Sequence, residues 1–566
     1  MKRDKVIWLF GGSDIDVEKE TLTKFWQYTI NTTNDVSAFI VVPKTSQNVL
    51  MISTMSRRLK ERIIWKDSSA HLKIFRMADA LFVSSSATDV RVDNDETIST
   101  APIIFLPSYD DEPCAWLHAG SEDNCIFRYI VPNKTIYDYL TIARDFKDYQ
   151  LLLLKDIYDE DSAKFSSAAD ELMENILFAH RNSVAFIGFA LTHVGGTPVA
   201  THALAEGLLE CGWFVKYICL RLSKVVSTPP GIPILAMDDG VHKRPARCKG
   251  FDKLLPQSVR LSHLKYDPGD FSNDCGILLK RALQQERVSL LVSTRESLHL
   301  FLDEVRNPYV SDKVYFFHCQ SDVLKINFGR AVSKISKMQI KKAVFVTDRN
   351  RIALKEKFKI DNFGSYCVLG NGLGSYRMCE RNEICKSQIS NDVIDVCWLV
   401  RIEKERASDF ENLFSFGTYL KENKIENVRV SVYGQGAYLN DFIDEIKKRG
   451  LTKIILHKGV SNNVKETYSK YDAVVDFTRI QSFGMVYIEA ILNGRMVFCY
   501  RNEGSQEVLR DIPEAFFDTN EELLDKLNNL SQVTSGKMLN FYDLIAKRFS
   551  RQAIAKKFVS FVKFNG

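Results

Sequence analysis

Short apolar runs alternate with longer polar, helix-like stretches along most of the chain, and no other feature constrains the fold as strongly. Within residues 1–175 the apolar runs lie at 6–10, 38–42, 80–83 and 102–106. Strands that are joined by helices over short connections pair in parallel, because the crossover returns the chain to the same end of the sheet. The alternation therefore predicts an α/β fold made of parallel sheets.

A second and a third unit repeat this pattern after residue 183. The second begins with a strand at 184–189, a glycine-bearing turn and a helix at 199–209, and the third begins with a strand at 393–400. We expect two Rossmann-like domains, whose ligands bind at the carboxyl ends of the strands, in the cleft between the domains. The other expected strands are 214–220, 289–292, 313–317 and 343–347 in the second unit and 428–433, 453–456, 473–476 and 496–500 in the third.

The pattern divides the chain into three predicted domains. These are an accessory α/β domain at 1–175, an amino-terminal Rossmann-like domain at 183–385 and a carboxyl-terminal one at 390–566. A chain of 566 residues is too long for one ordinary core, which agrees with this division. The charged run 155–164 and the helix-like stretch after it are interpreted as a connector.

Composition and cysteine usage favour a cytoplasmic protein. The chain is 45% hydrophobic and 26% charged, as is typical of globular proteins. Its 12 cysteines stand singly without a C-x-x-C pair, which predicts reduced thiols rather than disulfides or zinc ligands. The apolar run at 6–10 is too short for a signal peptide, and no stretch reaches the ~18 apolar residues of a membrane span. We therefore expect a protein that is neither secreted nor inserted in a membrane.

Charge is concentrated at the carboxyl end. Residues 537–566 carry seven basic side chains and one acid, which accounts for more than the net charge of +5 of the whole chain. Phenylalanines are interleaved with these cations, so the tail is either a packed terminal helix with a solvated face or a contact for anionic lipid at the inner membrane face. The scattered charge of the rest of the chain argues against nucleic-acid binding.

The segment 473–509 carries the clearest functional signal. Its sequence predicts a strand, a turn and then a helix that contains Glu489. Backbone N–H groups at the start of such a helix are unpaired and lie at the positive end of its dipole, so they suit a diphosphate. A carboxylate further along the helix, at Glu489, can accept hydrogen bonds from a ribose diol. The turn consists of Ser482, Phe483, Gly484 and Met485.

This segment resembles the donor-site signature of the family-four retaining glycosyltransferases, which have the GT-B fold and an E-x7-E pattern around an S-F-G turn. The second acid of the pattern matches Glu489, which by this resemblance holds the nucleotide ribose. The first acid falls on Gln481, a departure that removes a charge but keeps a hydrogen-bond acceptor for the donor sugar. The resemblance covers residues 183–550.

The same resemblance implies a pair of cations that bind the donor diphosphate. The family presents an Arg and, five residues later, a Lys; here Arg401 takes the first place and Arg406 the second, with Lys404 a near alternative. Cations at this point neutralise the leaving diphosphate. Removing Arg401 or Glu489 is therefore expected to weaken donor use far more than folding.

Other landmarks of the family follow in order. Gly195 and Gly196 lie in a turn that resembles the glycine-rich first turn, where the donor phosphates and the acceptor approach the backbone. His318 lies at a strand end where the family often has a His near the reacting sugar. Gly434 belongs to a Y-G-Q-G segment similar to the family's strand and G-x-G, and Gly370 stands in the hinge approach where Pro is common.

By this resemblance the chain is a metal-independent hexosyltransferase that moves a sugar, with retention, from a nucleotide-sugar donor to a glycan, cell-surface polymer or related acceptor. Same-face attack, in which the leaving phosphate takes the acceptor proton, requires no strong protein base and no cofactor. The Asp pairs at 110–111 and 238–239 are interpreted as turn residues rather than metal ligands. The alternative is a non-catalytic glycosyltransferase-like subunit of a glycosylation complex, which Gln481 supports.

Residues 1–175 lie outside this resemblance. Their strand order and the passage from helix to strand at 72–83 faintly resemble the first half of the teichoic-acid-type glycerophosphotransferases. A substrate-positioning or oligomerisation domain is the alternative for this part of the chain.

Overall fold

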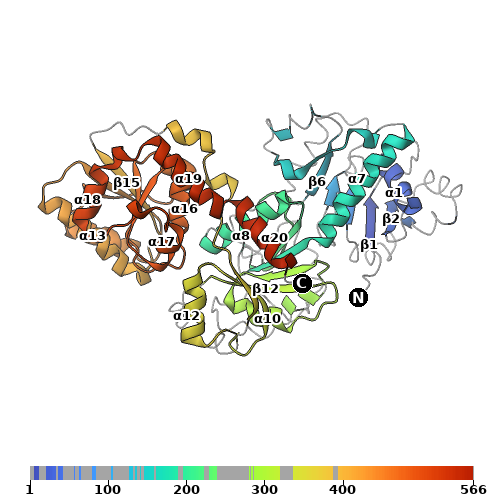
Figure 1. The fold of residues 1–566 in the computed structure, drawn as a ribbon, viewed down its shortest axis with the longest axis horizontal. Coiled ribbons are helices and arrows are strands. Elements are labelled where there is room, and N and C mark those ends of the chain that lie inside the picture. The colour runs from blue at the N-terminus through green and yellow to red at the C-terminus, as the bar shows by residue number, and fades with distance from the viewer. Residues whose placement is uncertain are drawn as a thin grey trace.

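Three parallel sheets organise the chain in the computed structural model, one in each of its three segments (Figure 1). All strand pairings in the part that the structure describes are parallel, which confirms the expected α/β fold. The structure describes residues 6–11, 21–32, 36–42, 57, 63–65, 80–83, 103–105, 126–131, 134, 136, 140–141, 146–158, 161–188, 191, 195–221, 229–238, 279–280, 282–284, 286–318, 335–361, 363–386 and 393–564.

The first sheet has seven strands in the order β3-β2-β1-β4-β5-β6-β7. Helices α1 (Thr21–Thr32) and α7 (Ser162–Arg181) share a core with it, in which Trp26, Phe82 and Leu172 are fully buried. The strands are β1 (Val6–Gly11), β2 (Val36–Val42), β3 (Ile63–Trp65), β4 (Ala80–Val83), β5 (Ile103–Phe105), β6 (Ile126–Val131) and β7 (Leu151–Leu153), followed by the short helix η3 (Lys155–Tyr158).

The second sheet repeats the strand order of the first, β10-β9-β8-β11-β12-β13-β14. Its first helix, α8 (Gly196–Glu210), begins before the predicted residue 199, because Gly195 and not a later residue is the N-cap. The predicted strand 343–347 is β13 (Ile340–Phe345), since Thr347 instead caps α12 (Asp348–Phe358) by accepting the Asn350 N–H. The other elements are β8 (Ser183–Gly188), β9 (Phe214–Arg221), β10 (Ile234–Asp238), β11 (Leu290–Ser293), β12 (Asp312–Phe317), β14 (Phe363–Val368) and α10 (His299–Glu304).

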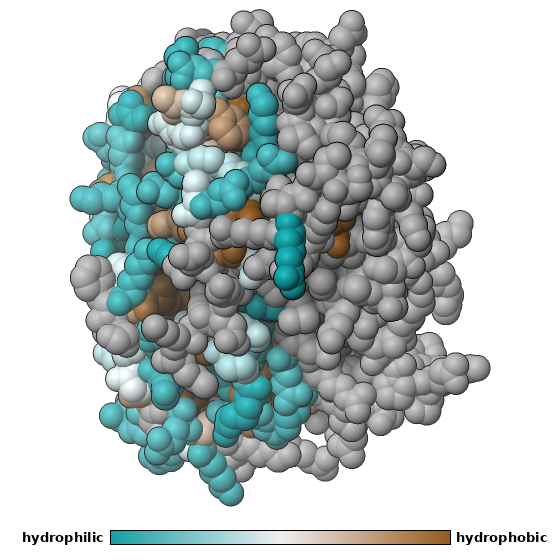
Figure 2. Space-filling model, turned by 90° about the vertical axis from the view of Figure 1, so that its right-hand side faces the viewer, coloured by the Kyte–Doolittle hydropathy of each residue, from teal (hydrophilic) through white to brown (hydrophobic). Residues whose placement is uncertain are grey.

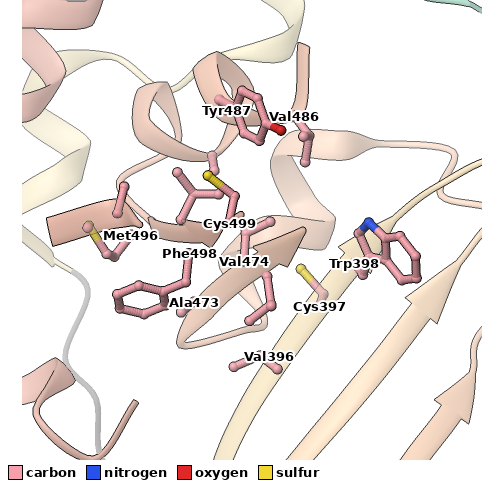
Figure 3. Packing of buried hydrophobic residues seen from close by; sticks show 14 of the residues in the cluster. Val396, Cys397, Trp398, Ala473, Val474, Val486, Tyr487, Met496, Phe498 and Cys499 are labelled. Atoms are coloured by element: carbon pink, nitrogen blue, oxygen red, sulfur yellow. The ribbon is translucent and has the colours of Figure 1, made fainter. Parts of the chain in front are cut away.

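The third sheet has five strands in the order β17-β16-β15-β18-β19. Figure 3 shows Val486 and Tyr487 of α16 (Met485–Leu492) packed above the strands that carry Cys397, Val474 and Cys499. The other elements are β15 (Ile394–Leu399), β16 (Val428–Tyr433), β17 (Ile455–His457), β18 (Ala473–Asp476), β19 (Met496–Cys499), α13 (Ala407–Glu422), α14 (Leu439–Lys448), α15 (Val464–Ser469), α17 (Glu503–Val508), α18 (Asn520–Asn528) and α19 (Ser535–Phe549).

The last helix, α20 (Arg551–Phe564), leaves the third domain and packs on α8 of the second, where Figure 1 shows the two side by side. Ile554, Ala555 and Phe558 are buried in the core of the second domain. The basic tail is therefore a packed amphipathic helix, although it lies within the range predicted for the third domain.

Several cations of the tail are engaged by the protein itself. Arg551 contacts Glu210, Lys537 pairs with Glu514 at 2.8 Å, and Lys557 donates to the Val368 carbonyl.

Among the helices that the structure describes, none is long and apolar enough to cross a bilayer. On the face shown in Figure 2, the described residues are mostly hydrophilic, with only isolated apolar ones between them.

Candidate functional site

Both Rossmann-like sheets have a topological switch point, the place where the strand order reverses. It lies between β8 and β11 in the second domain and between β15 and β18 in the third. Helices that follow such strands begin at the carboxyl edge of the sheet, where open α/β sheets bind their ligands. The helices that follow β8 and β18 are α8 and α16.

The turn at the start of α16 is fixed by its backbone and by one buried ring. Gly484, the N-cap, has φ = +85°, and a Cβ there would lie 2.2 Å from the Tyr487 ring, so only glycine fits. Phe483 is buried against Phe549, with ring centroids 5.4 Å apart. Among the described residues no side chain caps this helix start, and although the Tyr487 N–H donates to the Gly484 carbonyl, the N–H groups of Met485 and Val486 are left to bind an anion.

The start of α8 faces the start of α16. A Cβ placed on Gly196 would lie 3.9 Å from the Cγ of Met485, so the two glycine-bearing turns approach each other across the junction of the domains. Gly195 caps α8 with extended backbone and no side-chain hydrogen bond. The rest of the predicted turn, residues 193–194, lies outside the described residues.

The predicted diphosphate cations differ in availability. Arg401 and Lys404 are exposed at the carboxyl end of β15, and within the described ranges neither has a hydrogen-bond or ion-pair partner. Arg406 is instead turned toward Asp409 and Thr478, at 3.4 and 3.3 Å. Arg401 and Lys404 are therefore the cations that an anion can reach most directly.

Gly434 shapes the loop that presents Arg401. A Cβ on Gly434 would lie 1.8 Å from the Val400 carbonyl oxygen, so the loop after β16 packs backbone to backbone against the loop after β15. On the other side of Arg401 along the chain, the Ile402 N–H donates to the Gln435 carbonyl at 3.1 Å. Gly434 thus helps to fix the position of the loop that carries Arg401.

Gln481 and Ser482 leave their side chains free next to the turn. The Gln481 carbonyl accepts the Gly504 N–H at 2.9 Å, which fixes the backbone. Both side chains are half-buried, and neither has a polar partner among the residues that the structure describes. An amide and a hydroxyl are therefore available to a ligand at the start of α16.

Glu489 is buried and already bound by the protein. Its Oε1 accepts hydrogen bonds from Nε and Nη2 of Arg377, at 3.0 and 2.7 Å, and its Oε2 accepts from the Tyr468 hydroxyl at 3.3 Å. Arg377 ends η7 (Ser375–Arg377) in the segment that links the second and third domains. Sequence reasoning missed Arg377 and Tyr468, because neither belongs to a motif: Arg377 follows the hinge approach in the linking segment, and Tyr468 lies in α15.

His318 follows β12 and lines a small hollow. Its backbone N–H donates to Glu296 Oε1 at 2.8 Å, and its Nε2 is buried without a partner in the described part of the chain. Burial, and then the charge of Arg295, lower the pKa of His318 from 6.5 to about 3, so the imidazole is neutral. The hollow is also lined by Phe186, Ala200, Thr201, Leu204, Thr294, Phe316, Leu369, Gly370, Asn371 and Ile554.

The predicted turn residues at 110–111 and the side chains of 238–239 lie outside the described residues. The described ranges hold no group of three His, Cys, Asp or Glu side chains that could bind a metal ion. Six cysteines whose side chains the structure describes are free thiols, namely Cys211, Cys219, Cys367, Cys379, Cys397 and Cys499.

A family model, described as glycosyl transferases group 1, matches residues 386–534. No curated protein matches the chain. The match includes the third sheet, the loops with Arg401 and Gly434, and the α16 turn.

Solved structures of three glycosyltransferase-type proteins are similar in fold, each with a TM-score of 0.50. They are TarM of S. aureus (10% identity, 68% of this chain and 99% of that one), Anabaena HepE in complex with UDP-glucose (14%, 67% and 99%) and sucrose-phosphate synthase of Thermosynechococcus elongatus (14%, 68% and 98%). The chain therefore has the GT-B glycosyltransferase fold, and its third sheet carries the match to the glycosyl transferases of group 1.

Proposed function

We propose that the chain is a retaining glycosyltransferase that moves a hexose from a nucleotide-sugar donor to a glycan or cell-surface polymer. The observation that carries this proposal is the approach of the two helix starts, Gly196 and Met485, which no side chain caps among the described residues. Arg401 and Lys404, which have no partner within the described ranges, follow β15 at the carboxyl edge of the same sheet. Two helix dipoles and two cations at one place favour a diphosphate.

In this proposal the third domain holds the donor. The N–H groups at the start of α16 and the cations after β15 neutralise the diphosphate as charge develops on it during departure. The free side chains of Gln481 and Ser482 contact the sugar hydroxyls, and Glu489 receives the ribose. Charge neutralisation by these groups requires no metal ion.

The second domain would hold the acceptor next to the hollow lined by His318, Thr201 and Asn371. A neutral imidazole can orient a sugar hydroxyl without contributing positive charge to the site. The leaving phosphate then takes the acceptor proton on the face from which it departs, which keeps the anomeric configuration. Approach of the two domains aligns the reacting groups and excludes water.

The test is a donor panel on the purified full chain. UDP-, GDP-, ADP- and CDP-sugars are compared for stabilisation of the protein against heat and for slow hydrolysis, starting with UDP-glucose because the HepE structure contains it. The proposal expects at least one donor to raise the melting temperature and to be hydrolysed. Stabilisation by none of them would refute it.

A non-catalytic partner subunit is the second candidate, and two observations favour it. Gln481 replaces the first acid of the motif, and the Arg406 guanidinium is turned toward Asp409 and Thr478. For this candidate the same panel would give binding without turnover.

We also propose a cytoplasmic location, in agreement with the free thiols. A peripheral contact with anionic lipid would use the exposed Lys547 and Lys556, because the other cations of the tail, Lys563 over Phe178 and Trp213 included, contact the protein. Replacing Lys547 and Lys556 by Glu should then reduce sedimentation with phosphatidylserine vesicles at low salt. Wild-type protein that never sediments with such vesicles would refute the contact.

A further inference from the structure

The Glu489 carboxylate has one hydrogen-bonding position left. A carboxylate offers about four acceptor positions, two on each oxygen. Arg377 uses both positions on Oε1, and the Tyr468 hydroxyl uses one on Oε2. A ligand hydroxyl that approaches Glu489 can therefore bind only at Oε2, at the position that Tyr468 does not use.

Arg377 is itself held from both domains. The Asn493 side-chain amide donates to the Arg377 carbonyl at 2.8 Å and to the Glu489 carbonyl at 2.7 Å, which ties η7 to the end of α16. On the other side, Glu206 of α8 accepts hydrogen bonds from the Ser375 N–H and hydroxyl. The segment around Arg377 thus connects α8 with α16, the two helices whose starts face each other.

The pair between Arg377 and Glu489 is nearly removed from solvent, with side chains only 16% and 7% exposed. Burial lowers the pKa of Arg377, but the charge and hydrogen bond of Glu489, together with the neighbouring Tyr376 and Tyr468, raise it above its ordinary value. An ionised carboxylate at this depth requires a cation, because burial of an unpaired charge is very unfavourable. Without Arg377, the Glu489 carboxylate would lose both hydrogen bonds to Oε1 and the cation that compensates its buried charge.

We propose that Arg377 is a positioning residue for the nucleotide: it holds Oε1 of Glu489 by an ion pair and two hydrogen bonds, turns Oε2 toward the ribose and joins this acceptor to the segment that links the two domains. The inference rests on the proposed function and adds to it a residue that the donor motif does not contain. Arg377 acts through Glu489 and does not itself contact the nucleotide.

The experiment compares nucleoside diphosphates with and without the ribose diol. UDP, GDP, ADP and CDP, and the 2′,3′-dideoxy form of the tightest binder, are titrated by calorimetry into wild type, Arg377→Gln and Arg377→Lys. Arg377→Gln should weaken the ribose form about ten- to a hundredfold, the equivalent of one charged hydrogen bond, and leave the dideoxy form unchanged. Arg377→Lys keeps the cation and should recover part of the affinity.

Two matched variants separate this role from a purely structural one. Asn493→Ala removes the hydrogen bond to the Arg377 carbonyl but leaves the Glu489 carboxylate in place. It should therefore change the affinities for the ribose and dideoxy forms equally. The double variant Arg377→Gln with Glu489→Gln should bind no more weakly than either single variant, because both act on one contact.

The outcomes distinguish the two proposals. If wild type binds a diphosphate but Arg377→Gln weakens the ribose and dideoxy forms equally, the positioning role is overturned and the proposed function stands. If wild type does not distinguish the two forms, Glu489 does not hold the ribose and the inference is again overturned. If wild type binds none of the four diphosphates, the proposed function fails and the inference fails with it.

Discussion

At the scale of single residues, Glu489 lies in surroundings that the motif does not reveal. It is buried and paired with Arg377. Truncation to Ala would leave Arg377 without its partner, and breaking a buried ion pair in this way costs about 3–5 kcal/mol. Glu489→Ala is therefore expected to affect folding as well as donor use, whereas the sequence alone predicts a far larger effect on donor use than on folding.

The cleaner substitutions for donor use are Glu489→Gln and Arg401→Ala. Gln keeps the size and an acceptor for Arg377 at position 489, so Glu489→Gln should lose less stability than Glu489→Ala, although it too removes the charge of the buried pair. Arg401 is exposed without a partner in the described ranges, so Arg401→Ala should fold normally. Each removes one charged contact, and kcat/KM for the donor should fall by the equivalent of about 1.5–3 kcal/mol. Steady-state kinetics and thermal unfolding measure the two effects. Unchanged kinetics in both variants would contradict the site.

Gln481 should modulate activity without abolishing it. Its side chain is free beside the α16 turn, and its amide offers both an acceptor and donors. Gln481→Glu restores the charge and should change the rate or the donor preference by about 1–3 kcal/mol, while Gln481→Ala should reduce the rate. Activity in the Glu variant alone would identify the natural protein as a degenerate transferase.

At the scale of elements, the turn before α16 depends on one glycine. Gly484→Ala would force a side chain into a left-handed conformation and against the Tyr487 ring, which should lower the free energy of unfolding by about 1–3 kcal/mol. The donor affinity should fall with it, because the same backbone presents the free N–H groups. Chemical denaturation and donor titration test this.

Gly536→Ala is the matched control. Gly536 lies in α19 with nothing within 4 Å of an added Cβ, and Ala favours helix, so this variant should be as stable as wild type or more stable. Equal effects of the two substitutions would show that the Gly484 conformation is not required.

Three buried histidines of the second domain make its stability depend on pH. The pKa of His202 is lowered from 6.5 to about 4, and the pKa values of His299 and His318 are lowered from 6.5 to about 3. Burial is the largest cause of each shift. Below pH 6.5 the unfolded chain therefore binds protons that the folded chain does not, and stability falls as the pH decreases toward 4. Each histidine contributes up to about 1.4 kcal/mol per pH unit in this window.

The variant His202→Gln tests this dependence. The amide can replace the hydrogen bond between His202 Nδ1 and the Tyr217 hydroxyl, which is 2.8 Å long, but it does not titrate. Its stability, measured by denaturation at several pH values, should fall less steeply below pH 6.5 than that of wild type. An identical slope would contradict the assignment.

The elements also show where sequence reasoning fails. The predicted strands are mostly central ones, whose apolar runs reflect burial on both faces. The strands that the pattern missed include β3 and β7, the edges of the first sheet, and β10 and β14, the edges of the second. Edge strands pair on one side only and need no continuous apolar run, as the alternating burial of β14 illustrates.

The candidate site shows the same division between local and distant information. The turn before α16 and the cations after β15 are contiguous in sequence, so a motif can describe them. The contact between Arg377 and Glu489 joins residues 112 positions apart and arises only from the fold. Gly370 combines both kinds of information: its φ of +78° is a local backbone property that Pro cannot adopt, and its closeness to Phe549 arises from the fold.

At the scale of the whole molecule, α20 joins the third domain to the second. Phe558→Ala would open a cavity where α20 packs on α8, and such truncations cost about 3–5 kcal/mol. We expect a lower melting temperature and faster hydrogen exchange of the α20 amides. Lys556→Ala, an exposed change on the same helix, should alter neither. Normal α20 protection in Phe558→Ala would show that the helix is held by other contacts.

The chain passes between the second and third domains twice, and the two passages touch. The Leu373 N–H donates to the Phe549 carbonyl at 3.1 Å, and Leu373 pairs in parallel with Ser550. Two adjacent tethers define a line, and a body held along a line keeps one rotational degree of freedom and loses the other two. We therefore expect any relative motion of the domains to be a swing about the axis through Leu373 and Ser550, and such a swing would bring Gly196 back to the same place opposite Met485.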